Sequence, residues 1–199
     1  MIQFEGMKSE EQKNTRFEQL PAGPYVGRII DAKLEGEKPD QQLVLRLEVA
    51  EGEYAGYFGK RYQHDSEAGG QYSPRYKGDF KLRVPNDANP NARYPETDKR
   101  RFNDATWRIE QSNPGYVFQG DEKTLRGKMV GFSMQEDTYN GNTFTRIARL
   151  ERVMDVKNGL IKVMPPRQRK QNTGSVEMPT GPVSGGDGFL PVENIEVPF

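Results

Sequence analysis

Residues 43–49 read Leu43-Val-Leu-Arg-Leu-Glu-Val49, and this stretch carries the clearest structural signal in the chain. Every second residue from Leu43 to Val49 is apolar, while Arg46 and Glu48 stand between them. An alternation of period two is typical of a β-strand with one buried face. The stretch therefore predicts a strand whose leucines are buried and whose Arg46 lies on the opposite face.

Working outward from this stretch, other segments also favour strands. The segment 25–34 is rich in β-branched residues and follows the turn signal Pro21-Ala-Gly-Pro24. Near the other end of the body, Asn140-Gly141 is a hairpin turn signal between two apolar runs. The predicted strands are 25–34, 43–49, 57–63, 125–135 and 143–153, with a further short strand predicted at 80–84.

A single helix is predicted at 98–112. Asp98 is a candidate N-cap, and Asn113-Pro-Gly115 is a stop signal. The order of elements is then β, β, β, α, β, β, which is the order of an OB-fold, a five-stranded Greek-key barrel with a helix between strands three and four. Turn residues dominate 64–97, which predicts a long insertion after strand three.

Composition divides the chain into four parts. Nine of the 26 residues from Pro165 are Gly or Pro, a composition that cannot bury enough apolar surface to fold. The last eleven residues combine large apolar groups with two acids and no base. We expect an N-terminal extension at 1–20, the barrel domain at 21–164 with its insertion, a disordered linker at 165–188 and an acidic partner-binding tip at 189–199.

The residues that are absent exclude several classes of protein. With no cysteine, disulfide scaffolds and thiolate zinc sites are ruled out. The single histidine, His64, excludes a multi-histidine metal site. No apolar run suggests a membrane span or a secretory signal. We expect a cytoplasmic protein without a cofactor, a bound metal or a membrane partner.

Positive charge is concentrated in one part of the sequence. The net charge is zero, but residues 1–170 carry +4 and the last 29 residues carry −4. The segment 60–101 holds ten basic, six acidic and five aromatic residues. Its net charge of +4 therefore accounts for the whole excess of positive charge in residues 1–170. Clustered Lys and Arg side chains neutralise phosphates, and aromatic side chains between them stack on the nucleobases of a single strand.

Binding of single-stranded DNA, without sequence readout, is the function that this pattern favours. In an OB-fold the ligand crosses strands two and three and the neighbouring loops. The alternative is structural, with the tyrosines packing the insertion onto the barrel and the bases forming a solvated face. Trp107, the only tryptophan, is predicted to pack against the barrel. The candidate DNA-binding residues are Arg46, Lys60, Arg61, Tyr62, Tyr72, Tyr76, Lys81, Arg83, Tyr139 and Arg146.

Two other functions stay open. His64-Asp65 with Glu67 nearby could serve a metal-dependent nuclease, although one histidine beside carboxylates is equally typical of a surface pair. A β-rich phage structural or adaptor protein would share the strands and the terminal peptide but would not bind DNA. The favoured prediction is a protein that is not an enzyme.

The end of the chain resembles a known recruitment peptide. Glu193-Asn-Ile-Glu-Val-Pro-Phe199 is similar to the C-terminal tip of bacterial single-stranded DNA-binding proteins. In that family the tip recruits enzymes of DNA replication, recombination and repair, and its terminal Phe enters a hydrophobic pocket. The resemblance implies that such DNA-processing proteins bind Ile195, Val197, Pro198 and Phe199.

The body shows a second resemblance, which covers about residues 17–155. Leu20-Pro-Ala-Gly-Pro-Tyr-Val-Gly-Arg-Ile-Ile-Asp-Ala32, the alternating strand and Glu51-Gly-Glu-Tyr-Ala-Gly56 resemble an uncharacterised family of phages and integrative elements. Members of that family are encoded among recombination genes. Together the two resemblances imply a single-stranded DNA-binding protein of a phage or mobile element. They leave its oligomeric state open, a homo-oligomer included.

Overall fold

The computed structural model describes residues 17–38, 40–69, 73–85 and 95–168. The chain divides into two units: Met1–Arg169, which contains all the described residues, and Lys170–Phe199, which lies wholly outside them. The same holds for most of the predicted N-terminal extension and linker, for Tyr72, and for the whole predicted tip with Ile195, Val197, Pro198 and Phe199.

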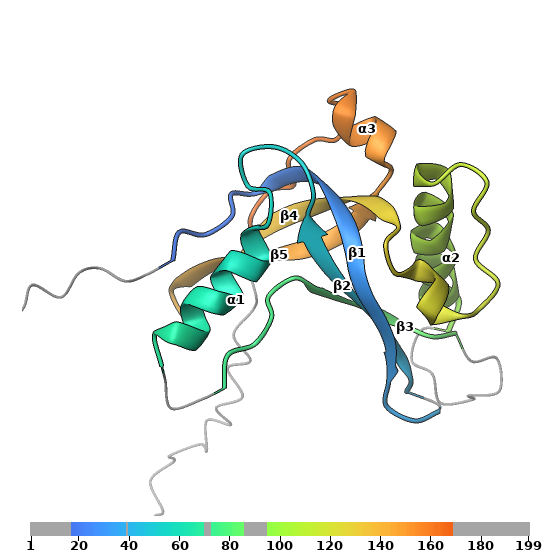
Figure 1. Ribbon diagram of the computed structural model, residues 1–199, viewed down its shortest axis with the longest axis horizontal. Coiled ribbons are helices and arrows are strands. Elements are labelled where there is room, and N and C mark those ends of the chain that lie inside the picture. The colour runs from blue at the N-terminus through green and yellow to red at the C-terminus, as the bar shows by residue number, and fades with distance from the viewer. Residues whose placement is uncertain (1–16, 39, 70–72, 86–94, 169–199) are drawn as a thin grey trace, which may run out of the picture. The chain divides into compact units, whose positions relative to one another are not determined.

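A twisted antiparallel sheet forms the centre of the first unit (Figure 1). Its strands lie side by side in the order β3-β2-β1-β4-β5. A short additional strand, β6 (Arg167–Gln168), runs parallel to β4. The five main strands are β1 (Gly23–Glu35), β2 (Gln42–Val49), β3 (Asp79–Arg83), β4 (Met129–Tyr139) and β5 (Asn142–Glu151).

The prediction of a mainly β fold is confirmed, but the sheet does not close into a barrel. β3 and β5 are the two edges, and among the described residues no strand pairing joins them. Within the sheet, β2 pairs with β1 on one side and β3 on the other, so Leu45 lies opposite both Ala32 and Phe80. The alternating leucines of β2 are buried, as their spacing predicts.

The predicted strand at 57–63 is wrong, because these residues form the helix α1 (Tyr57–Glu67). Gly56 turns the chain with a φ of 75°, a conformation that favours glycine. The Glu48 carboxylate of β2 then accepts hydrogen bonds from the backbone N–H groups of Phe58 and Gly59, which caps the helix start. The predicted insertion at 64–97 therefore includes the end of α1 and all of β3, which takes the third place in strand order.

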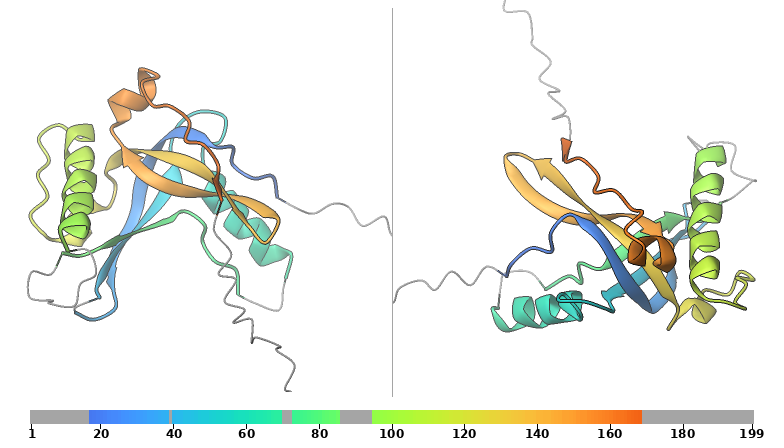
Figure 2. Two further views of the ribbon diagram at one scale, coloured as in Figure 1. Left: turned by 180° about the vertical axis from the view of Figure 1, so that it is seen from behind. Right: turned by 90° about the horizontal axis from the view of Figure 1, so that it is seen from above.

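The predicted helix is confirmed as α2 (Pro95–Ser112), which lies between β3 and β4 in the chain. Ala105 and Ile109 are buried against the sheet, with Phe102 partly buried beside them. Trp107 differs from its prediction, because 45% of it is exposed. Helices α1 and α2 lie at opposite ends of the sheet (Figures 1 and 2).

Two short elements complete the unit. The 3-10 helix η1 (Glu122–Leu125) precedes β4, so the predicted strand at 125–135 begins at Met129 instead. Helix α3 (Val153–Lys157) follows β5 and takes up the end of the predicted strand at 143–153. None of the described helices is long and apolar enough to cross a membrane.

Candidate functional site

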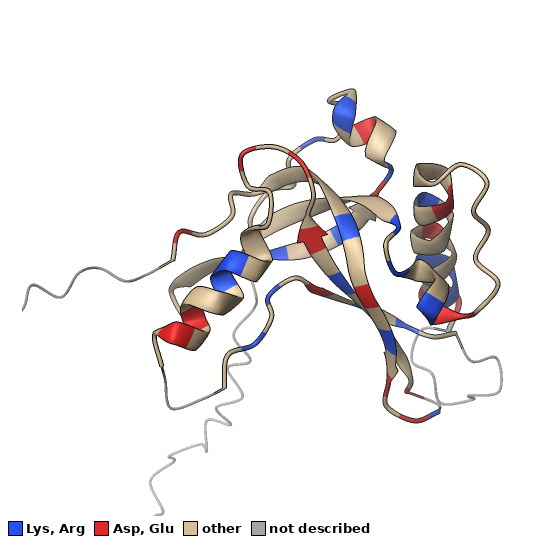
Figure 3. Ribbon diagram, in the orientation of Figure 1, with Lys and Arg blue, Asp and Glu red and all other residues tan. Residues whose placement is uncertain are grey.

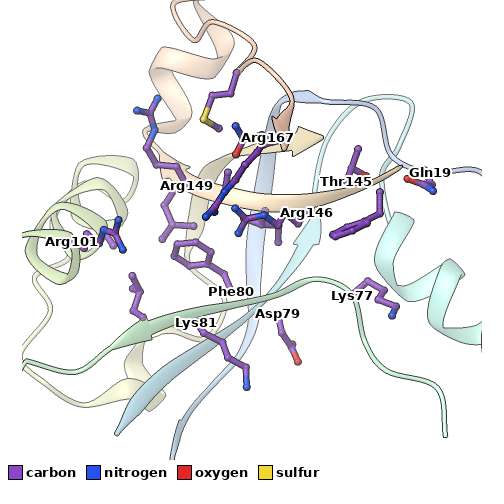
Figure 4. Close-up of a pocket in the computed structure, with 18 of the residues that line it drawn as sticks. Gln19, Lys77, Asp79, Phe80, Lys81, Arg101, Thr145, Arg146, Arg149 and Arg167 are labelled. Carbon is purple, nitrogen blue, oxygen red and sulfur yellow. The ribbon is translucent and has the colours of Figure 1, made fainter. Parts of the chain in front are cut away.

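A cavity of about 890 Å³ lies where the sheet is open, between the edge strands β3 and β5 (Figure 4). Residues 79–82 of β3 form one wall, and residues 144–150 of β5 form the other. Arg101, Asp104 and Ala105 of α2 close one end, and the segment before β6 contributes Met164. The groove therefore exists because the sheet stays open between its two edges.

Basic side chains dominate this cavity, which we call the basic groove. Lys and Arg are interspersed with Asp and Glu along the ribbon (Figure 3), whereas the lining of this cavity contains seven basic residues and only two acidic residues, Asp79 and Asp104. Aromatic and aliphatic side chains such as Phe80, Phe144 and Ile147 form apolar parts of the lining. The bases are Arg61, Lys77, Lys81, Arg101, Arg146, Arg149 and Arg167.

Three of the seven bases are available to a ligand. Lys77, Arg101 and Arg167 are exposed, and none of them forms an ion pair with any residue that the structure describes. They come from the segment before β3, from α2 and from β6, so the fold brings them together from distant parts of the sequence. No carboxylate of the described residues lies within ion-pair distance of these three side chains.

The arginines of β5 are held by buried carboxylates. The Nε of Arg146 lies 3.0 Å from Oδ2 of Asp137, which has no exposed surface. Arg149 lies 2.7 Å from Glu151, which is also fully buried and accepts a hydrogen bond from Ser133. Arg108 of α2 forms an ion pair with the same Glu151. These contacts fix the β5 wall of the basic groove and tie it to α2.

The remaining two bases are partly neutralised. Lys81 lies 2.9 Å from Glu35, which also pairs with Lys33. Hydrogen bonds from Lys33 and then Lys81 lower the pKa of Glu35 to about 2. Arg61 donates a hydrogen bond to the Tyr57 hydroxyl and lies 3.8 Å from Asp65.

Of the ten predicted DNA-binding residues, the structure brings Arg61, Lys81 and Arg146 together in the basic groove. Tyr139, at the turn between β4 and β5, is 49% exposed but does not line it. Tyr72 lies outside the described residues. The others that do not line it are Arg46, Lys60, Tyr62, Tyr76 and Arg83.

Several of these other side chains have structural partners. Arg46 donates a hydrogen bond to Asp79, which raises the pKa of Arg46, and its guanidinium lies 4.9 Å from the centre of the Tyr76 ring. Burial, followed by the nearby Glu48 carboxylate, raises the pKa of Tyr76. Lys60 donates a hydrogen bond to the carbonyl of Ala55.

Arg83 and Tyr62 also contact other parts of the protein. Arg83 lies 3.7 Å from Asp40 and 3.8 Å from Asp98. The Tyr62 ring lies 6.1 Å from the Tyr76 ring and remains 43% exposed. The face across β2 and β3 is therefore largely occupied by internal ion pairs, and the basic groove lies at its edge.

Sequence reasoning missed four of the seven groove bases, namely Lys77, Arg101, Arg149 and Arg167. Lys77 and Arg101 belong to the basic segment 60–101 but carry no feature that separates them from its other bases. Arg167 falls in the predicted linker, and the only signal for its role is spatial: Arg167 and Gln168 pair with Asp137 and Thr138 of β4.

The candidate nuclease residues lie on α1 and do not line the groove. The Nδ1 of His64 lies 3.4 Å from Oδ1 of Asp65, and the His64 ring lies 5.3 Å from the ring of Phe17. Glu67 accepts a hydrogen bond from Gln63. Within the described ranges, no group of three or more His, Asp or Glu side chains is placed to hold a metal ion.

No protein-family model matches this chain, and no curated protein matches its sequence.

Proposed function

We propose that this protein binds single-stranded DNA in the basic groove, through phosphate contacts and base stacking and without catalysis. The observation that carries the proposal is the lining of the groove, where seven bases meet two acids. Lys77, Arg101 and Arg167 pair with no carboxylate of the described residues, so bound phosphates would not have to displace an internal partner.

A flexible single strand fits this groove better than a duplex. The groove is recessed between β3 and β5, and Phe80 and Phe144 lie among its charged residues. A single strand can enter a recess and turn its bases toward aromatic rings, whereas a duplex keeps its bases stacked and presents only its backbone. Base stacking is tolerant of sequence, which is why no sequence readout is proposed.

The fold that we propose is an OB-fold opened between its third and fifth strands. The neighbour order β3-β2-β1-β4-β5, with α2 between β3 and β4, is the order expected for such a barrel. OB-folds are often only partly closed, and ligands bind near strands two and three and the loop between strands four and five. Tyr139 lies at that loop here, which keeps it a candidate for DNA contact.

The C-terminal tip is proposed as the second functional part. By its resemblance to the tip of bacterial single-stranded DNA-binding proteins, it would recruit DNA-processing proteins through Ile195, Val197, Pro198 and Phe199. The protein would then hold a single strand with its body and deliver enzymes of replication, recombination or repair to it.

The direct test is fluorescence anisotropy of labelled oligo-dT against the purified full chain, repeated with a duplex and across a salt series. We expect tight binding to the single strand that weakens steeply with salt, and weaker binding to the duplex. Incubation of unlabelled DNA with protein and magnesium tests for nuclease activity in the same preparation. A lack of binding to oligo-dT at low salt would overturn the proposal.

A further inference from the structure

The outer face of α2 carries an exposed aromatic side chain that the basic groove does not use. Trp107 is the only tryptophan in the chain and is 45% exposed, whereas Ala105 and Ile109 of the same helix are buried. An indole that is nearly half exposed gives up much of the burial energy that its size offers. Its position on the surface leaves part of the indole accessible to a ligand.

A second cavity, of about 470 Å³, lies against this indole. Its lining follows one stripe of α2, with positions 96, 99, 100, 103 and 107 at the spacing of successive helical turns. Arg152 fixes the ring: its guanidinium carbon lies 5.4 Å from the indole centre, and its Nε and Nη2 each lie 2.7 Å from an oxygen of Asp155. The indole is thus supported by a positioned cation beside an open cavity.

The second cavity adjoins the basic groove, with which it shares a lining residue. Asp104 lines both cavities, and Arg101 in the groove is next to Arg100 in the second cavity. A ligand that extends from the groove past Arg101 along α2 would therefore reach the neighbouring Trp107 face. That the two cavities are neighbours favours the same ligand in both places.

The balanced charges of the second cavity suit a nucleobase better than a phosphate. Lys99 and Arg100 are balanced by Glu96 and Asp104, and Asp104 also lies 2.9 Å from Arg108. Asn103 supplies an amide that can both donate and accept hydrogen bonds at the edge of a base. An exposed indole with a polar amide beside it, and little net charge, is the chemistry of a base-stacking platform.

We propose that Trp107 stacks on a nucleobase of the same single strand whose backbone occupies the basic groove. The inference rests on the proposed function and extends it, because it adds a second contact on α2 that determines part of the site size. A strand in the groove supplies phosphates to Arg101, and its next exposed base reaches Trp107. The alternative is that this face of α2 binds another protein, in which case Trp107 would not respond to DNA in the test below.

The test uses the sole tryptophan as a reporter. The full chain is titrated with unlabelled oligo-dT while intrinsic fluorescence is recorded, and labelled oligo-dT is followed by anisotropy under the same conditions. We expect quenching that saturates at the same concentration as the anisotropy change. Trp107→Ala should weaken binding on the order of tenfold with an unchanged salt slope, because it removes stacking but no phosphate contact. Trp107→Phe should keep most of the affinity.

The outcomes separate this inference from the proposed function. If oligo-dT binds by anisotropy while the fluorescence stays constant and Trp107→Ala binds as tightly as the wild type, the stacking role is overturned and the proposed function stands. If anisotropy shows no binding, both fail. A thermal melt of each variant checks that a loss of affinity is not a loss of folding.

Discussion

The Tyr76 hydroxyl donates a hydrogen bond to the Glu48 carboxylate, 2.9 Å away, and so connects the segment before β3 to the start of α1. The same carboxylate also accepts hydrogen bonds from the backbone N–H groups of Val49, Phe58 and Gly59, at 2.9, 2.9 and 2.7 Å. One carboxylate on β2 therefore holds both a helix and the chain that leads into β3. Lys77, which lines the basic groove, follows Tyr76 directly in the chain, but Tyr76 itself does not line the groove.

This network predicts a separation of stability from DNA affinity. Glu48→Gln replaces one accepting oxygen by an amide and should lower the free energy of unfolding by about 2 kcal/mol. Tyr76→Phe removes only the hydroxyl and should lower the free energy of unfolding by about 1 kcal/mol. Since Tyr76→Phe keeps the ring, oligo-dT affinity should stay within twofold of the wild type. Urea unfolding and anisotropy measure the two quantities, and a large loss of affinity in Tyr76→Phe would place its hydroxyl in the DNA site.

The exposed groove bases should determine the salt dependence of binding. Lys77→Ala, Arg101→Ala and Arg167→Ala each remove a cation that has no carboxylate partner among the described residues. Each should weaken oligo-dT binding and reduce the slope of log affinity against log salt by about 0.7, the value for one phosphate on a single strand. Anisotropy across a salt series measures both.

A matched control for these variants is Lys123→Ala. Lys123 is exposed on η1 and does not line the groove, so its removal changes the net charge equally without removing a proposed contact. We expect its salt slope to match that of the wild type. Equal slopes for the control and the three groove variants would show that the groove is not the binding site.

Glu35→Gln should strengthen DNA binding, because it releases a groove base. Glu35 pairs with Lys33 and Lys81, and Lys81 lines the groove. Without the carboxylate, Lys81 becomes available to a phosphate, so oligo-dT affinity at low salt should rise several-fold. Glu37→Gln is the matched control, since Glu37 is exposed and forms no ion pair with a described residue. Equal affinities of the two variants would contradict this role for Lys81.

The same carboxylate predicts a pH dependence of stability. Its pKa is lowered from 4.5 to about 2 in the folded protein, mainly by the hydrogen bond from Lys33. The ionised form is therefore favoured by folding, and its contribution to stability is present above pH 4.5 and is lost as the pH falls toward 2. We expect Glu35→Gln to be less stable than the wild type at pH 7 and equally stable near pH 2. Urea unfolding at both pH values measures the difference, and a constant difference would contradict the ion-pair origin.

The local sequence pattern was sufficient to predict most of the strands and α2, but it did not predict α1. Period-two alternation identifies β2 because one face of that strand is buried along its whole length. The segment 57–63 begins with Tyr57-Phe58, which favours a strand by propensity. Its helix depends on the cap from Glu48, which lies ten residues before Phe58 in the sequence. Such a tertiary contact is not visible in a window of neighbouring residues.

The candidate site was predictable only in part, for the same reason. The clustering of charge in the sequence identified Arg61 and Lys81. The groove is also lined by basic side chains of α2, β5 and β6, which come together only because the sheet stays open between β3 and β5. The exposure of Trp107, by contrast, had a signal in the sequence. Trp107 follows Ala105 by two residues, about 200° around a helix, and so lies away from the buried face.

The tail should affect DNA binding and partner binding separately. Arg167 lines the groove, and residues 171–199, which carry a charge of −4, follow it in the same chain. A tethered acidic segment competes with phosphate for the same cations at a high effective concentration. Deletion of residues 171–199 should therefore tighten oligo-dT binding at low salt, and the gain should vanish at high salt.

Deletion of only residues 197–199 should instead abolish partner binding and leave DNA affinity unchanged or slightly tighter, because Glu193 and Glu196 remain. The measurement is a binding assay with a DNA-processing enzyme that binds the tip of bacterial single-stranded DNA-binding proteins. Phe199→Ala should fail to bind that enzyme, whereas the matched variant Phe189→Ala should bind it normally, since only the terminal Phe matches the tip. A large loss of DNA affinity on deleting 197–199 would contradict the division between a DNA-binding body and a recruiting tail.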